Sequence, residues 1–309
     1  MRVGVFGAGA VGSYFGGKLA RAGCDVVFVG RGDHLERMRR NGLVVKSVEG
    51  DFHVFAVTAR SPAEVGVCDV VLLTVKAYDL GEAARSLDPM VGQGTTIIPL
   101  QNGVESEERL ISLFGPERVV GGLCYVGAAV SRPGEVEHSA AGRIVIGELD
   151  GRLTIRLATL QNLFSEADIP VKLTEEIMAE KWKKLAWNVS FNAISALTRA
   201  TVGRMLVIPE TRELVSQAIA ETVAVARAGG IMLDRDLPER VIEDNRVYAN
   251  LKTSMLRDAE RGSALEFEAL NGAVCRAGVA SGIPTPVNSF LYSLLKCMDP
   301  TVPGSSGHL

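Results

Sequence analysis

The sequence predicts an α/β protein with two domains, and three observations support this. Short runs of β-branched residues alternate with amphipathic stretches as far as residue 172, which is typical of strand-helix-strand units on a mainly parallel sheet. The first run leads straight into a glycine-rich turn, Gly7-x-Gly9-x-x-Gly12. From about Leu173 onward, long helical periodicities replace the alternation. We therefore expect a Rossmann-type dinucleotide-binding domain over residues 1–172, an all-helical domain over 173–300 and a flexible tail over 301–309.

Apolar runs bounded by turn residues predict the strands of the first domain, at residues 2–6, 26–29, 70–74, 96–99 and 119–123. Residues 43–48 and 52–58 predict a hairpin inserted into the alternation. The stretch 125–147 predicts further strands, with a turn at Pro133-Gly134. Amphipathic stretches predict helices at 10–22, 35–41, 79–87, 106–114 and 152–167.

The second domain is expected to consist of helices at residues 174–198, 211–228, 239–247, 263–280 and 286–298. A nucleotide domain followed by a helical domain predicts that the substrate binds in a cleft between them, above the carboxyl ends of the strands.

The glycine-rich turn predicts a site for the pyrophosphate of a dinucleotide. Gly7 permits the tight turn from strand to helix, Gly9 lets the backbone approach the pyrophosphate, and Gly12 lets the helix pack close to the sheet. The helix that follows points its free N–H groups and its positive dipole end at the phosphates. The cofactor-binding residues expected here are Gly7, Ala8, Gly9, Ala10, Val11 and Gly12.

Arg31 follows the second strand, where an NAD-binding protein usually carries an acidic residue for the ribose hydroxyls. A guanidinium forms charge-assisted hydrogen bonds with a 2'-phosphate, so NADP is favoured over NAD. Asp33, two residues on, is interpreted as the N-cap of the next helix rather than as a ribose ligand. The alternative for Arg31 is a solvated residue after a strand.

Composition limits the possible partners and the compartment. The 309 residues, 47% hydrophobic and 22% charged, are ordinary for a soluble protein, and the net charge of −3 gives no bulk attraction to nucleic acid or to anionic lipid. No apolar run reaches the length of a membrane span, and the first strand follows Met1 directly, so we expect a cytoplasmic protein. The five cysteines are scattered without metal-ligand spacing, which predicts buried thiols and no metal site.

Lys184, Asn188 and Asn192 form the most informative pattern of the second half. A spacing of four places all three on one stripe of a helix. Asparagine is a mediocre residue for a helix interior, and its amide needs partners when it is buried. A lysine with two amides can bind a small oxygenated substrate and protonate a developing alkoxide. The alternative is a lysine that lies along a solvated face, with asparagines bonded to neighbouring loops.

Lys76 and Asn102 each follow a predicted strand, at the edge where carboxyl ends of parallel strands open onto a ligand. Lys76 can reach a phosphate or ribose, and Asn102 can lie near the nicotinamide and the substrate. The alternatives are a surface lysine and a turn formed by Asn102-Gly103.

The segment from Thr253 to Gly272 contributes two further candidates. Ser254 is a candidate hydroxyl donor to the substrate, and its alternative is a helical serine bonded to its own backbone. Ser263-Ala264-Leu265-Glu266 has the pattern of a capping box, which would fix the Glu266 carboxylate at a helix start.

Taken together, these residues resemble the ketopantoate reductase (2-dehydropantoate 2-reductase) family over nearly the whole chain. The motifs that carry the resemblance are GAGAVG at 7–12, Gly30-Arg31, TVKAYDL at 74–80, LQNG at 100–103, EKWKKLAWNVSFN at 180–192 and SMLRDAERGSALEFEALNG at 254–272. The resemblance implies a Rossmann-type domain and a helical domain like the C-terminal domain of 6-phosphogluconate dehydrogenase.

By the same resemblance, Lys184 is the proton donor. It also implies that Asn102, Asn188, Asn192 and Ser254 hold the keto acid together with Lys184, and that Glu266 touches the cofactor. Arg31 and Lys76 match the residues at the 2'-phosphate end, and the backbone near Ala128 should line the nicotinamide. One departure is Val202, where some family members place a substrate-binding asparagine.

The activity that this implies is NADPH-dependent reduction of 2-dehydropantoate to D-pantoate, in the synthesis of pantothenate and coenzyme A, by a monomer or homodimer. Two alternatives remain open. One is a reductase for another small 2-oxo acid or an imine, and the other is a non-catalytic NADPH sensor, which would have no use for the Lys-Asn-Asn stripe.

Overall fold

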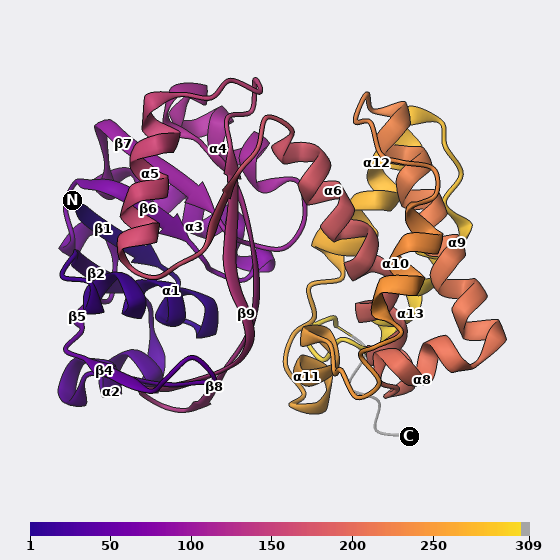
Figure 1. Ribbon diagram of the computed structural model, residues 1–309, viewed down its shortest axis with the longest axis horizontal. Coiled ribbons are helices and arrows are strands. Elements are labelled where there is room, and N and C mark those ends of the chain that lie inside the picture. The colour runs from indigo at the N-terminus through magenta and orange to yellow at the C-terminus, as the bar shows by residue number, and fades with distance from the viewer. Residues whose placement is uncertain (304–309) are drawn as a thin grey trace. The chain divides into compact units, whose positions relative to one another are not determined.

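The computed structural model describes residues 1–303 and divides the chain into two compact units (Figure 1). Unit 1 contains Met1–Gln101 and Ser106–Ile177, and unit 2 contains Asn102–Glu105 and the chain from Met178 onward. Of the tail expected at 301–309, residues 304–309 lie outside the described part of the chain. Its first residues are held by Asp299, whose Oδ1 accepts a hydrogen bond from the Thr301 backbone N–H at 2.8 Å.

The main sheet of unit 1 has five parallel strands in the order β5-β2-β1-β6-β7. Their chain order is third, second, first, fourth, fifth, which is the Rossmann order. The order reverses between β1 and β6, so the carboxyl ends of these two strands lie side by side, with Phe6 paired to Leu73. The strands are β1 (Arg2–Phe6), β2 (Asp25–Val29), β5 (Val57–Ala59), β6 (Cys68–Leu73) and β7 (Val91–Pro99).

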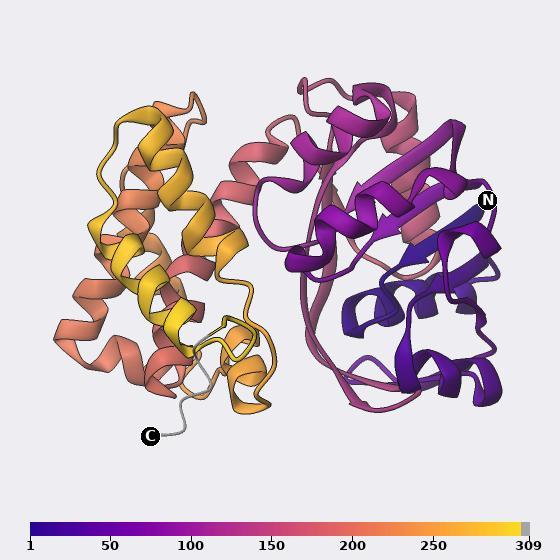
Figure 2. The same cartoon turned by 180° about the vertical axis from the view of Figure 1, so that it is seen from behind.

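Successive side chains of these strands point to opposite faces of the sheet, where they form two apolar layers. Val26 and Phe28 of β2 pack with α1 (Ala10–Arg21), α2 (Gly32–Asn41) and α5 (Ile155–Glu166), whereas Val27 and Val29 pack on the opposite face. That opposite face is covered by α3 (Leu80–Ser86) and α4 (Ser106–Phe114), which lie toward the viewer in Figure 2. Burial on both faces explains why these strands are continuous apolar runs.

A second, mixed sheet of unit 1 has the order β10-β9-β3-β4, and β8 pairs antiparallel with β9. Its strands are β3 (Leu43–Ser47), β4 (Phe52–Val54), β8 (Gly121–Arg132), β9 (Glu135–Gly147) and β10 (Val171–Leu173). The predicted hairpin and the predicted turn at Pro133-Gly134 are confirmed. The single strand expected at 52–58 is wrong, because β4 pairs with β3 while β5 joins β2 in the other sheet, and the chain bends between them.

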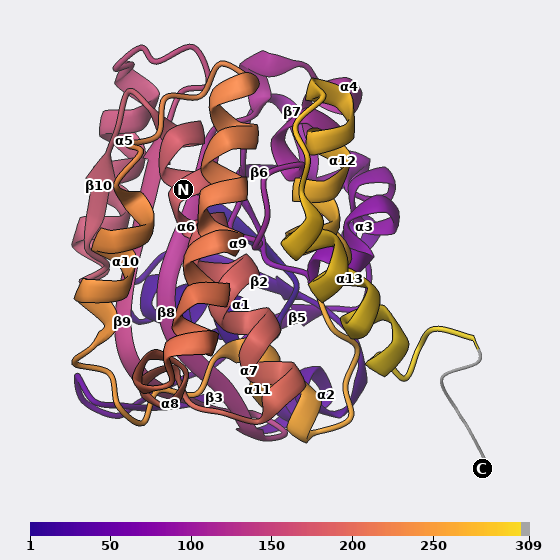
Figure 3. The ribbon, with the colours of Figure 1, turned by 90° about the vertical axis from the view of Figure 1, so that its right-hand side faces the viewer.

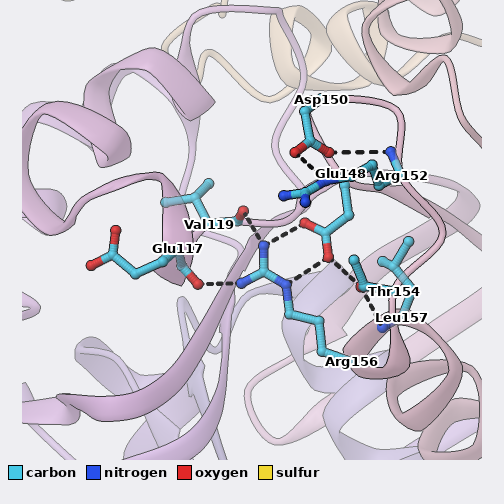
Figure 4. A network of polar contacts seen from close by, with 8 residues as sticks. All are labelled: Glu117, Val119, Glu148, Asp150, Arg152, Thr154, Arg156 and Leu157. Atoms are coloured by element: carbon cyan, nitrogen blue, oxygen red, sulfur yellow. Dashed lines mark hydrogen bonds and ion pairs between the residues drawn. The ribbon is translucent and has the colours of Figure 1, made fainter.

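A partly buried ion pair between Arg156 and Glu148 connects α5 to this part of unit 1 (Figure 4). Arg156 Nε donates to Glu148 Oε1 at 2.7 Å, and the same guanidinium donates to the backbone carbonyls of Glu117 and Val119. Thr154, the N-cap of α5, also donates to Glu148. Burial alone would raise the pKa of Glu148, but the hydrogen bonds from Arg156 and Thr154 hold that pKa below its usual range.

Unit 2 is helical, as predicted (Figure 3). The 20-residue helix α9 packs against α10, α12 and α13, around an apolar core that includes Val189, Ile219 and Leu291. No helix of residues 1–303 is long and apolar enough to span a membrane. The helices are α6 (Ile177–Trp187), α7 (Ala193–Thr198), α8 (Val202–Val207), α9 (Pro209–Ala228), α10 (Leu237–Asn245), α11 (Ser254–Glu260), α12 (Ala273–Ser281) and α13 (Pro286–Met298).

Two π-turns interrupt helices that the periodicity predicts as regular. The turn η5 (Asn188–Asn192) lies between α6 and α7, and η6 (Glu268–Gly272) precedes α12. In a π-turn the hydrogen bond runs from i to i+5, as from the Gly272 N–H to the Phe267 carbonyl at 2.9 Å. Each π-turn therefore contains one residue more than a regular α-helical turn.

Two predicted helix caps are wrong. The helix expected from Ser263 begins only at Glu268, because the Leu265 N–H is bound at 2.5 Å by the buried Asp299 carboxylate at the end of α13. A tertiary contact thus replaces the capping box. Asp33 is not an N-cap either, since α2 begins at Gly32, with Arg31 at the N-cap and Asp33 in the first turn.

Candidate functional site

The glycine turn of unit 1 shows a separate steric role for each glycine. Gly7 has a φ of +112°, and a Cβ there would collide with the backbone of Thr74 and Val75, directly after β6. A Cβ on Gly12 would collide with the Gly7 carbonyl and the Thr74 side chain. A Cβ on Gly9 would meet nothing within 4 Å. Open space at the second glycine is what the approach of a pyrophosphate requires.

The N-terminus of α1 is suited to an anion. Gly9 is the N-cap, no side chain caps the helix, and its first turn carries no acidic residue. The first backbone N–H groups of a helix have no partner within the helix, and the macrodipole places partial positive charge beside them. The residues present therefore fit a phosphate-bearing cofactor at residues 7–12.

Thr74 holds this turn in place, and the sequence reasoning missed it. Its Oγ1 donates to the Gly7 carbonyl at 2.8 Å, and its backbone N–H donates to the Phe6 carbonyl at 2.8 Å. The end of β1 is thereby fastened to the end of β6. A polar β-branched residue directly after an apolar strand is the signal that could have found it.

Arg31 is connected to the segment that contains Lys76. The exposed Arg31 guanidinium lies 3.4 Å from the Asp79 carboxylate, and the Asp79 N–H donates to the Lys76 carbonyl at 2.9 Å. Two cationic residues and one carboxylate therefore border the carboxyl ends of β2 and β6. Asp79 is the second residue of this site that the sequence reasoning did not identify.

In unit 2 the structure brings Asn188 and Asn192 together across the π-turn η5. Asn192 Nδ2 lies 3.4 Å from Asn188 Oδ1, and the two side chains are 1% and 5% exposed, respectively. Within residues 1–303, Asn188 Nδ2 and Asn192 Oδ1 are buried without a hydrogen-bond partner. The two side chains thus leave one donor and one acceptor unsatisfied. Each costs about 1–3 kcal/mol.

Lys184 lies one helical turn before Asn188 and is half-buried in α6. On a regular α-helix each step of four residues overshoots one turn by about 40°. A step of four across an i to i+5 turn falls short of a full turn instead. The π-turn therefore offsets the 40° overshoot between Lys184 and Asn188. As a result, Asn192 lies closer to the same side of the helix as Lys184 than it would on a regular α-helix.

Asn102 and Glu266 also meet within unit 2. Asn102 Nδ2 donates to Glu266 Oε2 at 3.2 Å, and Glu266 is 8% exposed. The loop 102–105 is fastened to the π-turn η6 by Arg276, which bonds Glu105 Oε2 at 2.8 Å and the Glu268 carbonyl at 2.8 Å. Gly103 has a φ of +94°, so the segment is also the turn that the Asn-Gly pair predicts.

The remaining candidates occupy distinct places. Ser254 is exposed at the first position of α11, whose N-cap Thr253 accepts from the Leu256 N–H at 3.1 Å. Ala128 lies in β8 opposite His138. Val202 is fully buried at the start of α8. Gln101, for which the sequence offers no signal, has both side-chain amide atoms buried without a partner among residues 1–303.

No group of three or more His, Cys, Asp or Glu side chains suited to a metal ion occurs within the part of the chain that the structure describes. All five cysteines are free thiols. The expected burial is confirmed for Cys68 and Cys124 and is wrong for the other three, since Cys24 and Cys275 are partly exposed and Cys297 is exposed.

The main sheet has the Rossmann strand order, with a glycine turn where the order reverses. These features define the class: a protein with a Rossmann-type dinucleotide-binding domain, here followed by a helical unit. The chain belongs to the ketopantoate reductase family. The family described as "Ketopantoate reductase PanE/ApbA" matches residues 3–151, and its C-terminal counterpart matches residues 176–299.

Individual relatives agree with this assignment. The chain is 33% identical to an uncharacterized oxidoreductase of Bacillus subtilis, with 94% of this chain and 97% of the relative covered. It is 33% identical to a 2-dehydropantoate 2-reductase of Mesorhizobium japonicum, with 96% and 97% covered. The crystal structure of 2-dehydropantoate 2-reductase from Geobacter metallireducens superposes with a TM-score of 0.90 at 36% identity, with 96% of this chain and 99% of that chain covered.

A ternary structure of D-mandelate dehydrogenase with NADH and anilino(oxo)acetate has the same fold, with a TM-score of 0.91 at 21% identity over 98% of this chain and 99% of that chain.

Proposed function

We propose that this protein reduces 2-dehydropantoate to D-pantoate with NADPH. The observation that carries the proposal is the stripe of Lys184, Asn188 and Asn192, in which the two asparagines leave one donor and one acceptor unsatisfied. A substrate hydroxyl both accepts and donates a hydrogen bond, so it satisfies such a pair. 2-Dehydropantoate carries a hydroxyl group in addition to its 2-oxo acid function.

A nicotinamide cofactor bound at these residues would supply the hydride that reduces C2 of the substrate. Residues 7–12 bind its pyrophosphate through the α1 N-terminus, and Arg31 with Lys76 binds the 2'-phosphate. We propose that Glu266 and the backbone near Ala128 contact the nicotinamide end. Of these residues, Glu266 is oriented by its hydrogen bond from Asn102.

Lys184 supplies the proton. As the C2 carbonyl oxygen takes on alkoxide character, the Lys184 ammonium stabilises the negative charge and transfers one proton from Nζ to that oxygen. The C2 carbonyl becomes a C2 hydroxyl, and the neutral amine regains a proton from water. Asn102, Asn188, Asn192 and Ser254 hold the substrate so that the carbonyl stays in line with the donor.

A second candidate substrate is another small 2-oxo acid. Val202 is fully buried in the apolar core, so this position offers the substrate no polar contact. That feature favours a substrate with fewer polar groups. The non-catalytic sensor is less favoured, because a sensor has no need for two buried asparagines with unsatisfied atoms.

The proposal is tested by following NADPH absorbance with 2-dehydropantoate and with a panel of other 2-oxo acids, including phenylglyoxylate. We expect the highest kcat/KM for 2-dehydropantoate. A higher value for another 2-oxo acid would move the assignment to that acid, and no NADPH oxidation with any of them would contradict a reductase.

Replacing Lys184 by alanine tests the proton donor. We expect kcat to fall by about 10²–10⁴-fold, which is the usual contribution of a general acid, while NADPH affinity stays within about twofold. The matched control is Lys183→Ala, because Lys183 neighbours Lys184 and forms a partly buried ion pair with Glu180. Turnover near the wild-type rate in Lys184→Ala would remove Lys184 from the mechanism.

We further propose that the enzyme acts in the cytoplasm as a monomer or homodimer. Analytical ultracentrifugation at micromolar concentration distinguishes the two states.

A further inference from the structure

The two π-turns of unit 2 are joined by one buried side chain, Asn271. Asn271 lies within η6 and is 0% exposed. Its Nδ2 donates to the backbone carbonyl of Val189, in the middle of η5, at 2.9 Å. The same Nδ2 donates to Asn288 Oδ1 at 3.1 Å. A side chain 82 residues away in sequence thus bonds the backbone of the turn that carries Asn188 and Asn192.

A π-turn needs such a partner. Because i to i+5 bonds replace i to i+4 bonds, the regular hydrogen-bond ladder is broken and carbonyls near the turn require other donors. Side chains supply these donors on both sides of η5. Ser190 Oγ donates to the Ala186 carbonyl at 3.0 Å and to the Trp187 carbonyl at 3.1 Å, and Ser195 Oγ donates to the Asn192 carbonyl at 3.1 Å. Among these donors, Asn271 alone comes from another helical segment.

The position of Asn271 is fixed in turn by Asn288 and Glu221. Asn288 Nδ2 donates to Glu221 Oε2 at 2.8 Å and to the Ala218 carbonyl at 3.1 Å. Glu221, on α9, accepts from the backbone N–H groups of Val287 at 2.8 Å and Asn288 at 2.9 Å. A carboxylate at the N-terminus of α13 is favoured by the helix dipole. These hydrogen bonds therefore connect α9 and α13, through Asn271, to the Val189 carbonyl within η5.

We propose that Asn271 is a positioning residue for the substrate: by bonding the Val189 carbonyl it keeps η5 in its π form, and so sets the direction of Asn188 and Asn192 relative to Lys184. The inference rests on the proposed function, since it assigns Asn271 to the same substrate site. Asn271 does not itself touch the substrate. Its effect passes through the backbone, where a shift of one residue in hydrogen-bond register turns both asparagine side chains.

Asn271→Asp tests this role, because aspartate keeps the shape of the side chain and removes both N–H donors. We expect KM for the 2-oxo acid to rise about tenfold or more and kcat to fall, while KM for NADPH stays within about twofold. Amide hydrogen exchange at residues 189–194 should become faster, since the turn loses an anchor. This second readout is independent of turnover.

Two further variants separate positioning from general stability. Thr211→Val removes a hydroxyl that donates to the Ile208 carbonyl at 3.1 Å at the start of α9, and Thr211 shares no acceptor with Asn271 or Asn288. It should lower the free energy of unfolding without changing KM for the 2-oxo acid. Glu221→Gln keeps the side-chain shape and one carbonyl oxygen, so we expect a smaller rise in KM in the same direction as Asn271→Asp.

The results that overturn the inference are distinct from failure of the proposed function. Wild-type protein that reduces no 2-oxo acid contradicts the proposed function, and this is measured before any variant. If wild-type protein is active, unchanged exchange at 189–194 in Asn271→Asp shows that Asn271 does not hold the turn. Faster exchange with an unchanged KM shows that the turn does not position the substrate. An equal rise in KM in Thr211→Val would show that the rise in Asn271→Asp comes from lost stability and not from positioning of the substrate.

Discussion

Arg31 and Asp79 form an exposed ion pair where we propose that the 2'-phosphate binds. The Asp79 carboxylate, 3.4 Å from the guanidinium, and a phosphate would compete for the same donors. An exposed pair of this kind contributes little to stability, so it yields readily to a dianion. Asp79 also offers an acceptor to a ribose hydroxyl, which is the role that carboxylates play in NAD-binding proteins.

Substitutions at this pair should therefore change the choice between NADPH and NADH. Asp79→Asn is expected to tighten NADPH binding several-fold, because the competing negative charge is removed, and to weaken NADH binding slightly. Arg31→Asp is expected to weaken NADPH about tenfold or more, and far more than NADH. Fluorescence titration with both cofactors measures this. Equal losses for NADPH and NADH in Arg31→Asp would show that Arg31 does not bind the 2'-phosphate.

At the level of residues, sequence reasoning identifies side chains whose neighbours are local and misses those whose neighbours are distant. The spacing of Gly7, Gly9 and Gly12 gives the steric role of each, because the turn is built from adjacent residues. Asn271 and Asp79 stay hidden because their partners lie 82 and 48 residues away, respectively. Ser263 is misinterpreted for the same reason, since Asp299 takes the backbone donor of Leu265.

At the level of elements, the strand-turn-helix unit at the N-terminus contains one glycine that leaves open space for a ligand and another that the packing of the turn requires. Gly9 has an ordinary φ of −84° and open space around a Cβ, so Gly9→Val should fold normally and lose cofactor affinity. Gly12→Val should instead destabilise the protein, because its side chain would collide with the Gly7 carbonyl and Thr74.

Calorimetry with and without NADPH distinguishes these outcomes. At 100 times its dissociation constant a ligand adds about 2.7 kcal/mol to stability, and we expect this shift for wild-type protein but not for Gly9→Val. A full NADPH-induced shift in Gly9→Val would contradict pyrophosphate binding at this turn.

His34 links three elements of unit 1 and makes their association pH-dependent. Its Nδ1 accepts from the Gly134 N–H at 3.0 Å between β8 and β9, and its Nε2 lies 3.1 Å from Ser13 Oγ on α1. Burial lowers the pKa of His34 below its usual 6.5. Protonation would remove the lone pair that Gly134 uses.

The sign of the effect follows from linkage. Because the folded pKa lies below the unfolded value of 6.5, the unfolded chain binds the proton first as the pH falls. The contribution of neutral His34 to stability is complete above about pH 6.5 and is lost progressively below it. Urea unfolding between pH 7.5 and about pH 5 should show a smaller pH dependence for His34→Gln than for wild type. Identical slopes would exclude His34 as a source of this dependence.

The elements that the sequence predicts correctly are those with a clear period. The strands β1 and β2 and the helices α4 and α13 agree with their patterns to within one residue. The π-turns are not predictable in this way, because a single i to i+5 turn leaves the apolar pattern of a 22-residue helix nearly unchanged. The strand expected at 52–58 divides because its two halves pair in different sheets, which no local pattern reports.

At the scale of the whole molecule, each unit has its own apolar core, and the polar groups buried within unit 2 are concentrated around its π-turns. In residues 1–303, three of the five buried side-chain atoms without a partner belong to Asn188, Asn192 and Asn271. Unit 2 is therefore less stable than its apolar packing alone would allow.

Replacing Asn188 and Asn192 by apolar residues should remove this cost to the stability of unit 2. The double variant Asn188→Leu, Asn192→Leu puts apolar side chains of similar length into an apolar surrounding, and we expect the free energy of unfolding to rise by about 1–3 kcal/mol while reductase activity is lost. Thermal unfolding and NADPH oxidation measure the two effects. A variant that is both less stable and inactive would show that the asparagines serve the fold rather than the substrate.

The unsatisfied atoms of Asn188 and Asn192 also have a consequence for protein engineering. A screen that selects this protein for heat resistance alone will collect apolar substitutions at these two positions, and the survivors will be inactive. Selection for turnover will restore the asparagines at the expense of heat resistance. The two positions should therefore be held constant in any stabilised version of the enzyme, with the search directed to the outward faces of α9 and α13 instead.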